Sequence, residues 1–154
     1  MKAYIIILLL GISLSYNTKA AIEYANKYCS NYNKIFYNYN SENDGRDSAN
    51  FVSQCLHEGG QGFEGCNGVD LKGMIPRVSD LKACLISKGW KSSLGVKPVN
   101  FKAGYPIFIK NYHRAMLATD IKGDIIYHSA HSPDRCNAKF RVSSLEFIIY
   151  KVNY

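Results

Sequence analysis

Ser48 is the residue of this 154-residue chain whose type and place most clearly allow chemistry. It stands where a polar loop ending at Asp47 runs into an amphipathic helical pattern, Ser48 to Leu56. A helix N-terminus carries unpaired N–H groups and the positive end of the helix dipole, so it stabilises anions. Thiol hydrolases place their nucleophile at such a point, but a hydroxyl needs a base to take its proton during attack. The chemistry in question is therefore acyl transfer with Ser48 as nucleophile.

The best candidate for that base is His113, which opens the apolar strand pattern from Arg114 to Thr119. A strand end beside a helix N-terminus is a rigid support from which to aim an imidazole. A tight turn at Lys122-Gly123 would pair His131 with Arg114, close to His113. The same turn would place His128 farther along the strand, on the face opposite to His131.

The segment from Asp47 to Gln54 resembles the nucleophile segment of the putative amidase domain family, distant relatives of the NlpC/P60 and papain-like cysteine hydrolases. The family pattern reads approximately Asp-Cys-Thr-Asn-Phe-Val-Ser-Gln, so Ser48 stands where the family has cysteine. The helix after residue 20 resembles the family's opening Ala-Tyr-Ala helix, and Phe101 to Gly104 resembles the turn before its first strand. Tyr127 to Arg135 resembles the family's Ser-x-His-Thr-x-Asp-Arg segment.

This resemblance implies hydrolysis of amide bonds, with peptidoglycan peptides as the substrate class. In that scheme Ser48 attacks, His113 moves the proton and His131 orients His113, with His128 in reserve as the third residue. Asp47, Asn50 and His128 are candidate substrate-binding residues. Asp47 also fits the more common role of capping the helix. The mechanism calls for no cofactor and no metal.

Replacement of sulfur by oxygen leaves several functions open. One is a serine-dependent amidase with reduced or retuned activity. A second is a pseudoenzyme, a secreted binding module that recognises wall fragments without cutting them. A small disulfide-stapled toxin or inhibitor is a third class. An engineered Cys→Ser change at position 48 would also explain the residue, and would make the cysteine count six.

The first 20 residues have the pattern of a secretory signal, with Lys2 followed by the apolar run Ile5 to Leu14. Cleavage near Ala20 would leave residues 21–154 as a single domain, secreted and not membrane-spanning. The formal net charge of the whole chain is +7. A basic secreted domain favours anionic partners, yet no nucleic-acid motif is present. Five cysteines fit disulfides in an oxidising compartment, but the sequence leaves their pairing and the oligomeric state open.

Periodicity predicts helices at 21–32, 48–58 and 80–88, followed by strands at 106–110, 114–121, 124–131 and 147–152. Helices that precede strands without alternation indicate an α+β fold with an antiparallel sheet. The resemblance further implies a papain-like or NlpC/P60-like arrangement, with the N-terminal helices packed on that sheet.

Overall fold

The computed structural model describes residues 15–40, 46–109, 114–140 and 145–149. Three helices precede six strands in the chain. Their bounds are α1 Thr18–Tyr28, α2 Ser48–Glu58, α3 Val78–Ser87, β1 Lys91–Leu94, β2 Pro106–Ile109, β3 Arg114–Lys122, β4 Ile125–Ala130, β5 Arg135–Phe140 and β6 Leu145–Ile149. The expected α+β class with an antiparallel sheet is confirmed.

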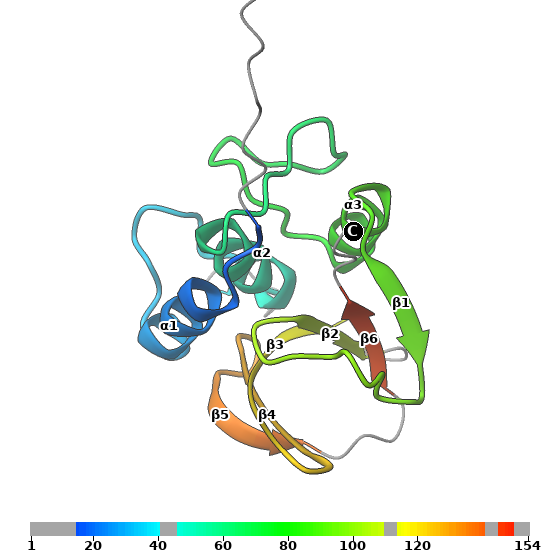
Figure 1. Cartoon of the computed structure of the whole chain (residues 1–154). Coiled ribbons are helices and arrows are strands. Elements are labelled where there is room, and N and C mark those ends of the chain that lie inside the picture. Colours follow the sequence, from blue (N-terminus) through cyan, green and yellow to red (C-terminus); the bar gives the residue numbers. More distant parts are fainter. Residues whose placement is uncertain (1–14, 41–45, 110–113, 141–144, 150–154) are drawn as a thin grey trace, which may run out of the picture.

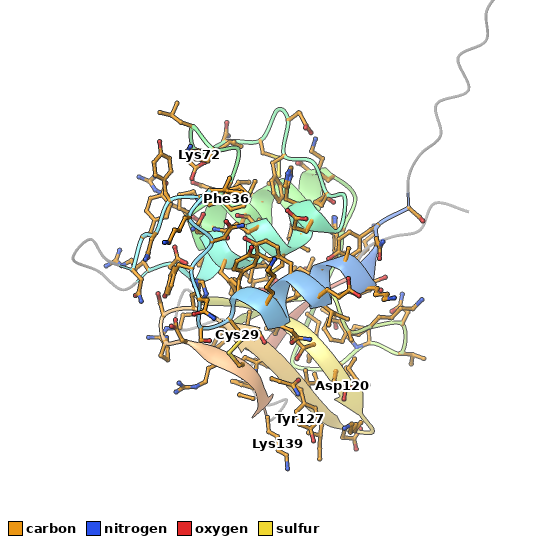
Figure 2. The ribbon with its side chains drawn as sticks, turned by 90° about the vertical axis from the view of Figure 1, so that its left-hand side faces the viewer. Cys29, Phe36, Lys72, Asp120, Tyr127 and Lys139 are labelled. Carbon is orange, nitrogen blue, oxygen red and sulfur yellow. A yellow bond between two sulfur atoms is a disulfide. The ribbon has the colours of Figure 1, made fainter. Side chains whose placement is uncertain are left out.

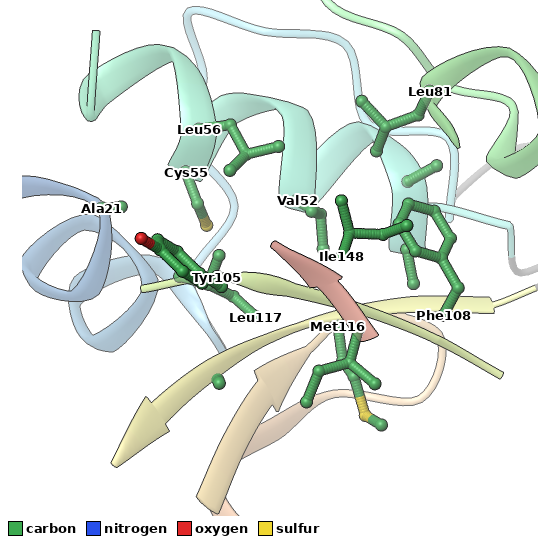
Figure 3. Close-up of a cluster of buried hydrophobic side chains, with 14 of the residues drawn as sticks. Ala21, Val52, Cys55, Leu56, Leu81, Tyr105, Phe108, Met116, Leu117 and Ile148 are labelled. Carbon is green, nitrogen blue, oxygen red and sulfur yellow. The ribbon is translucent and has the colours of Figure 1, made fainter. Parts of the chain in front are cut away.

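The strands form one antiparallel sheet in the order β1-β6-β2-β3-β4-β5. The helices lie on one side of it, with α2 between α1 and α3 (Figure 1). Residues Ser48 to Leu56 of α2 are all buried, because this helix packs against both α1 and β3. Val52 points down toward the sheet from α2, while Met116 of β3 points away from the helices (Figure 3). The sheet therefore has one face covered by α2 and one face turned away from it.

The start of α1 differs from the expectation. The helix begins at Thr18 rather than Ala21, because the side chain of Asn17 accepts a hydrogen bond from the Ala20 N–H at 3.1 Å. Tyr16 precedes this cap and donates its hydroxyl to the Gly104 carbonyl at 2.6 Å. Its ring lies against Trp90, with 5.2 Å between the ring centroids. Tyr16 and Asn17, which precede Ala20, are therefore integral to the packed structure.

The central hairpin turns at Gly123-Asp124, one residue later than the expected Lys122-Gly123, with a positive φ of 59° at Gly123. Its register differs by one residue at His128, which pairs with Ala118 rather than Leu117. Next to the turn the register differs by two residues, with Lys122 opposite Ile125, and the irregularity between Ala118 and Asp120 reduces this difference to one. Strands β1 and β5 had not been expected from the sequence. Both are edge strands with mostly exposed side chains. Strand β1 has no alternating apolar signal, whereas β5 does alternate polar and apolar residues and could have been found from that pattern.

Two disulfides close the structure. Cys29, just after α1, bonds to Cys136 in β5, and Cys66 bonds to Cys84 in α3. Figure 2 shows Cys29 where the end of α1 meets the edge of the sheet. Cys55 remains a free thiol, fully buried in α2, as its apolar position suggested. In the described part of the chain, each helix is too short or too polar to cross a membrane.

Candidate active site at the start of helix α2

Ser48 is the first residue of α2, and its hydroxyl oxygen faces the start of β3. The Ser48 Oγ accepts a hydrogen bond from the Ala115 N–H at 3.3 Å. The side chain is 4% exposed. The structure thus brings the helix N-terminus to the strand that follows His113. His113 itself lies outside the described residues.

Asp47 occupies the N-cap position of α2, but its side chain does not cap the helix. The expectation of a capping role is wrong, because its carboxylate is held by groups outside the first turn's backbone. Oδ1 accepts hydrogen bonds from the Tyr39 N–H at 3.0 Å and from the Asn50 side-chain amide at 2.8 Å. Oδ2 lies 2.5 Å from His131 Nδ1. The carboxylate is completely buried, so these contacts replace the water that it loses.

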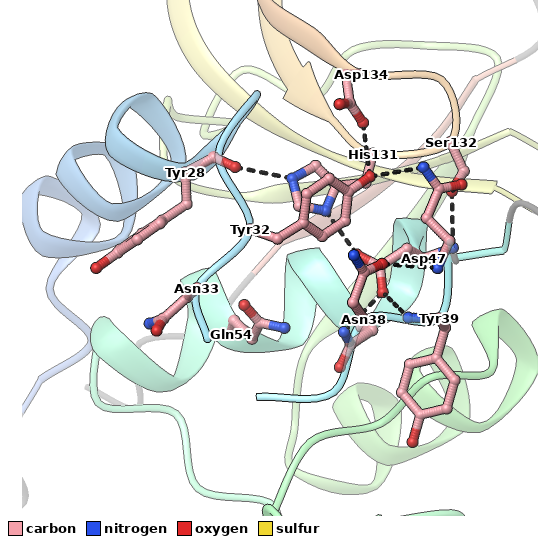
Figure 4. A network of polar contacts seen from close by, with 12 residues as sticks. Tyr28, Tyr32, Asn33, Asn38, Tyr39, Asp47, Gln54, His131, Ser132 and Asp134 are labelled. Atoms are coloured by element: carbon pink, nitrogen blue, oxygen red, sulfur yellow. Dashed lines mark hydrogen bonds and ion pairs between the residues drawn. The ribbon is translucent and has the colours of Figure 1, made fainter. Parts of the chain in front are cut away.

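His131 follows directly after β4, and its ring contacts groups from several parts of the chain (Figure 4). Its Nδ1 contacts Asp47, and its Nε2 lies 2.8 Å from the Tyr28 carbonyl oxygen. A carboxylate and a carbonyl are both hydrogen-bond acceptors, so each ring nitrogen of His131 faces an acceptor. The rings of Tyr32 and Phe51 each lie 4.1 Å from it, centroid to centroid. A hydrogen bond from His131 to another imidazole would require one of these two acceptors to be given up.

Asn50 and Ser132 complete the same buried network. Asn50 Nδ2 contacts both Asp47 and the Tyr37 carbonyl, each at 2.8 Å. The Ser132 hydroxyl accepts from the Asp47 N–H at 2.8 Å and donates to Asn40 Oδ1 at 3.0 Å. The polar groups around the start of α2 therefore join the helix to the end of β4 and to the tyrosine-rich segment between α1 and α2.

His128 lies apart from this network, on the face of the sheet turned away from α2. It is 6% exposed, and its ring stands edge-on to Phe140 with 5.4 Å between centroids. Burial lowers the pKa of His128, a backbone hydrogen bond to Ala138 opposes that shift, and the nearby Arg135 charge adds to it. Within the described residues, Nδ1 of His128 has no hydrogen-bond partner. Of the proposed site residues, Ser48, Asp47, Asn50 and His131 are thus brought together, and His128 is not part of their network.

Sequence reasoning missed the tyrosine-rich segment as a wall of this site. Tyr32 stacks on His131 and donates its hydroxyl to Asp134 at 2.8 Å. Tyr39 donates its backbone N–H to Asp47 and its hydroxyl to Asp70, both at 3.0 Å. The density of tyrosine and asparagine just before Asp47 was the available signal. The segment packs over the site, and of its tyrosines Tyr37 is the exposed one, at 41%.

Fold and site together define an α+β protein with a hydroxyl at a helix N-terminus against an antiparallel sheet. No group of three or more potential metal ligands occurs among the residues that the structure describes. The sequence matches the family model described as putative amidase domain over residues 15–94, which is half of the chain, and the chain belongs to this family. The match spans α1 to β1 and includes Ser48, whereas β2 to β6 lie outside it. Comparison with the curated proteins and with the solved structures gave no match.

Proposed function

We propose that this protein is an exported amidase-like hydrolase that acts on amide bonds of peptidoglycan peptides, with Ser48 in place of the family's nucleophilic cysteine. The observation that carries the proposal is the position of Ser48, which opens α2 and contacts β3 at Ala115. Membership of the amidase domain family supports the reaction class. The basic net charge of +7 and the two disulfides are compatible with an extracellular role on an anionic wall.

In this proposal Ser48 Oγ attacks the amide carbonyl carbon, and His113 takes the hydroxyl proton and returns it to the leaving amine. Water then cleaves the acyl ester by the same route. The backbone N–H of Ser48 serves as a donor to the oxyanion at the helix N-terminus. His131 acts as a positioning residue, because its contact with Asp47 fixes the residue that precedes the nucleophile. This role replaces direct orientation of His113 by His131, which would compete with the two contacts already made.

The second candidate is a pseudoenzyme of NlpC/P60-like ancestry that binds wall peptides without cutting them. The burial of Ser48 and the hydrogen bond to its Oγ favour this candidate, because both restrict a nucleophile. An inherited thiol site also fits oxygen poorly, since a serine hydroxyl cannot be ionised by a helix dipole.

The test is incubation of purified peptidoglycan with the Ser48 form, Ser48→Cys and Ser48→Ala, followed by mass analysis of the released fragments. We expect fragments with new amine and carboxyl ends from Ser48→Cys, fewer from the Ser48 form and none from Ser48→Ala. Release by Ser48→Ala equal to that of the others would remove Ser48 from the mechanism. Binding without fragments from any form would establish the pseudoenzyme.

For export, the signal segment must be cleaved at a point that leaves the folded domain intact. Cleavage near Ala20 would remove Tyr16 and the helix cap Asn17, both of which hold α1 in place. Ser13 and Ser15 supply small residues at the spacing used by signal peptidases. We therefore propose that the mature chain begins at Tyr16. N-terminal sequencing of the exported protein checks this, and a mature chain that starts at Ala21 would contradict it.

A further inference from the structure

A cavity of about 260 Å³ lies beside the candidate site, toward the face of the sheet that is turned away from α2. Met116, His128 and Phe140 contribute to its lining, from β3, β4 and β5. Its lining also includes Ala115 and His131. Because Ala115 donates to Ser48, the cavity borders the groups that hold the proposed nucleophile. A peptide bound in this cavity would therefore lie next to the groups that hold Ser48.

The charged side chains that line the described part of the cavity are all basic. Arg114 and Arg135 are exposed and line the cavity, with Lys139 beside them, and the described lining contains no aspartate or glutamate. In the part of the chain that the structure describes, none of these three cations forms an ion pair with a carboxylate. The Arg135 guanidinium donates to the backbone carbonyl of Asp134, at 3.0 Å. Exposed cations that converge on a hollow without carboxylates leave its potential positive.

His128 adds an unused hydrogen-bonding group to this positive hollow. Its side chain is 94% buried, and its Nδ1 has no partner among the described residues. A buried polar atom without a partner is destabilising, so such atoms usually bind a water or a ligand. Burial and the nearby Arg135 charge both lower the pKa of His128. The ring is therefore neutral at pH 7 and can pair with a polar ligand group without adding charge.

We infer that this cavity is a subsite for a peptide group with a free carboxylate, which Arg114 and Arg135 bind while His128 hydrogen-bonds the neighbouring peptide amide. A guanidinium holds a carboxylate through two parallel N–H donors, which gives such a subsite direction as well as affinity. The assignment of this ligand as the substrate rests on the proposed amidase function. It narrows that function to peptides that carry a carboxylate close to the amide bond to be cut.

The test measures binding to the Ser48 chain by calorimetry, with N-acetyl-alanyl-alanine and its C-terminal amide as the two probes. We expect the free acid to bind roughly tenfold more tightly than the amide, because a hydrogen bond to a charged group is stronger than one to a neutral group. Arg135→Gln should remove most of this difference and leave binding of the amide unchanged. Lys91→Gln is the matched control, because it removes one exposed positive charge from β1, at the opposite edge of the sheet.

Equal binding of the acid and the amide would overturn the inference, as would no saturable binding of the acid. A loss with Lys91→Gln as large as with Arg135→Gln would also overturn it, by showing a diffuse surface charge effect. If Arg135→Gln fails to fold, Arg114→Gln carries the same test. Selective binding without peptidoglycan cleavage would leave the subsite standing and reject only the proposed function. Cleavage by a chain that does not distinguish the acid from the amide would reject only the subsite.

Discussion

His131 and His128 are three residues apart in the chain, yet they lie in opposite surroundings. His131 has a carboxylate, a backbone carbonyl and two aromatic rings around it. His128 lies beside a hollow lined by cations, and its Nδ1 has no partner in the part of the chain that the structure describes. The first environment holds the His131 side chain in one geometry. The second leaves a nitrogen of His128 available to a ligand. The difference teaches that burial alone does not identify a functional histidine, whereas the partners of its nitrogens do.

The largest expected effect comes from breaking the network around His131. Asp47→Ala removes the buried carboxylate and leaves His131 Nδ1 and the Asn50 side-chain amide without this acceptor, so we expect a loss of about 3–5 kcal/mol in the free energy of unfolding. Urea denaturation followed by circular dichroism measures it. Asp134→Ala, which removes the exposed partner of the Tyr32 hydroxyl, is the control and should cost about 1 kcal/mol. Equal costs for the two variants would show that the Asp47 contacts do not hold this region.

The disulfide beside Tyr28 should contribute next. Cys29–Cys136 closes a separation of 107 residues and Cys66–Cys84 one of 18. Replacing Cys29 and Cys136 by serine should lower the free energy of unfolding by about 1.6 kcal/mol more than the same change at the shorter loop, in the chain-entropy account. It should also loosen the Tyr28 carbonyl that accepts from His131. A smaller cost for the longer loop than for the shorter one would contradict this ranking.

Changes at His128 should be mild and dependent on pH. A histidine whose pKa is lowered in the folded state binds fewer protons there than in the unfolded chain, so stability falls as pH drops below about 6.5. His128→Leu removes this dependence and the unpartnered nitrogen, so we expect equal or slightly higher stability at pH 7 and a flatter profile below it. Thermal unfolding between pH 5 and 8 gives the comparison. A large loss of stability at pH 7 would show that His128 holds the fold as His131 does.

The sequence predicted the bounds of α2 correctly, because the polar loop, Ser48 and the Gly59-Gly60 stop mark both ends. It did not predict the contact between Asp47 and His131, which are 84 residues apart and meet only after the sheet forms. The Tyr28 carbonyl that fixes His131 is a backbone group, and therefore has no signature in side-chain type. Strand β5 alternates polar and apolar residues, but its place beside β4 follows from sheet pairing and the Cys29–Cys136 bond, which the sequence left open.

The central claim is that the start of α2 is a site built for an activated nucleophile, and its most direct test is the pH dependence of alkylation in Ser48→Cys. Iodoacetamide would be used with the intact disulfides, and Cys55 is the internal reference because burial raises the pKa of its thiol. We predict that the introduced thiol reacts with an apparent pKa clearly below about 8.5, and that His113→Ala raises this pKa. An apparent pKa at or above that value, or unreactivity equal to that of Cys55, would contradict the account.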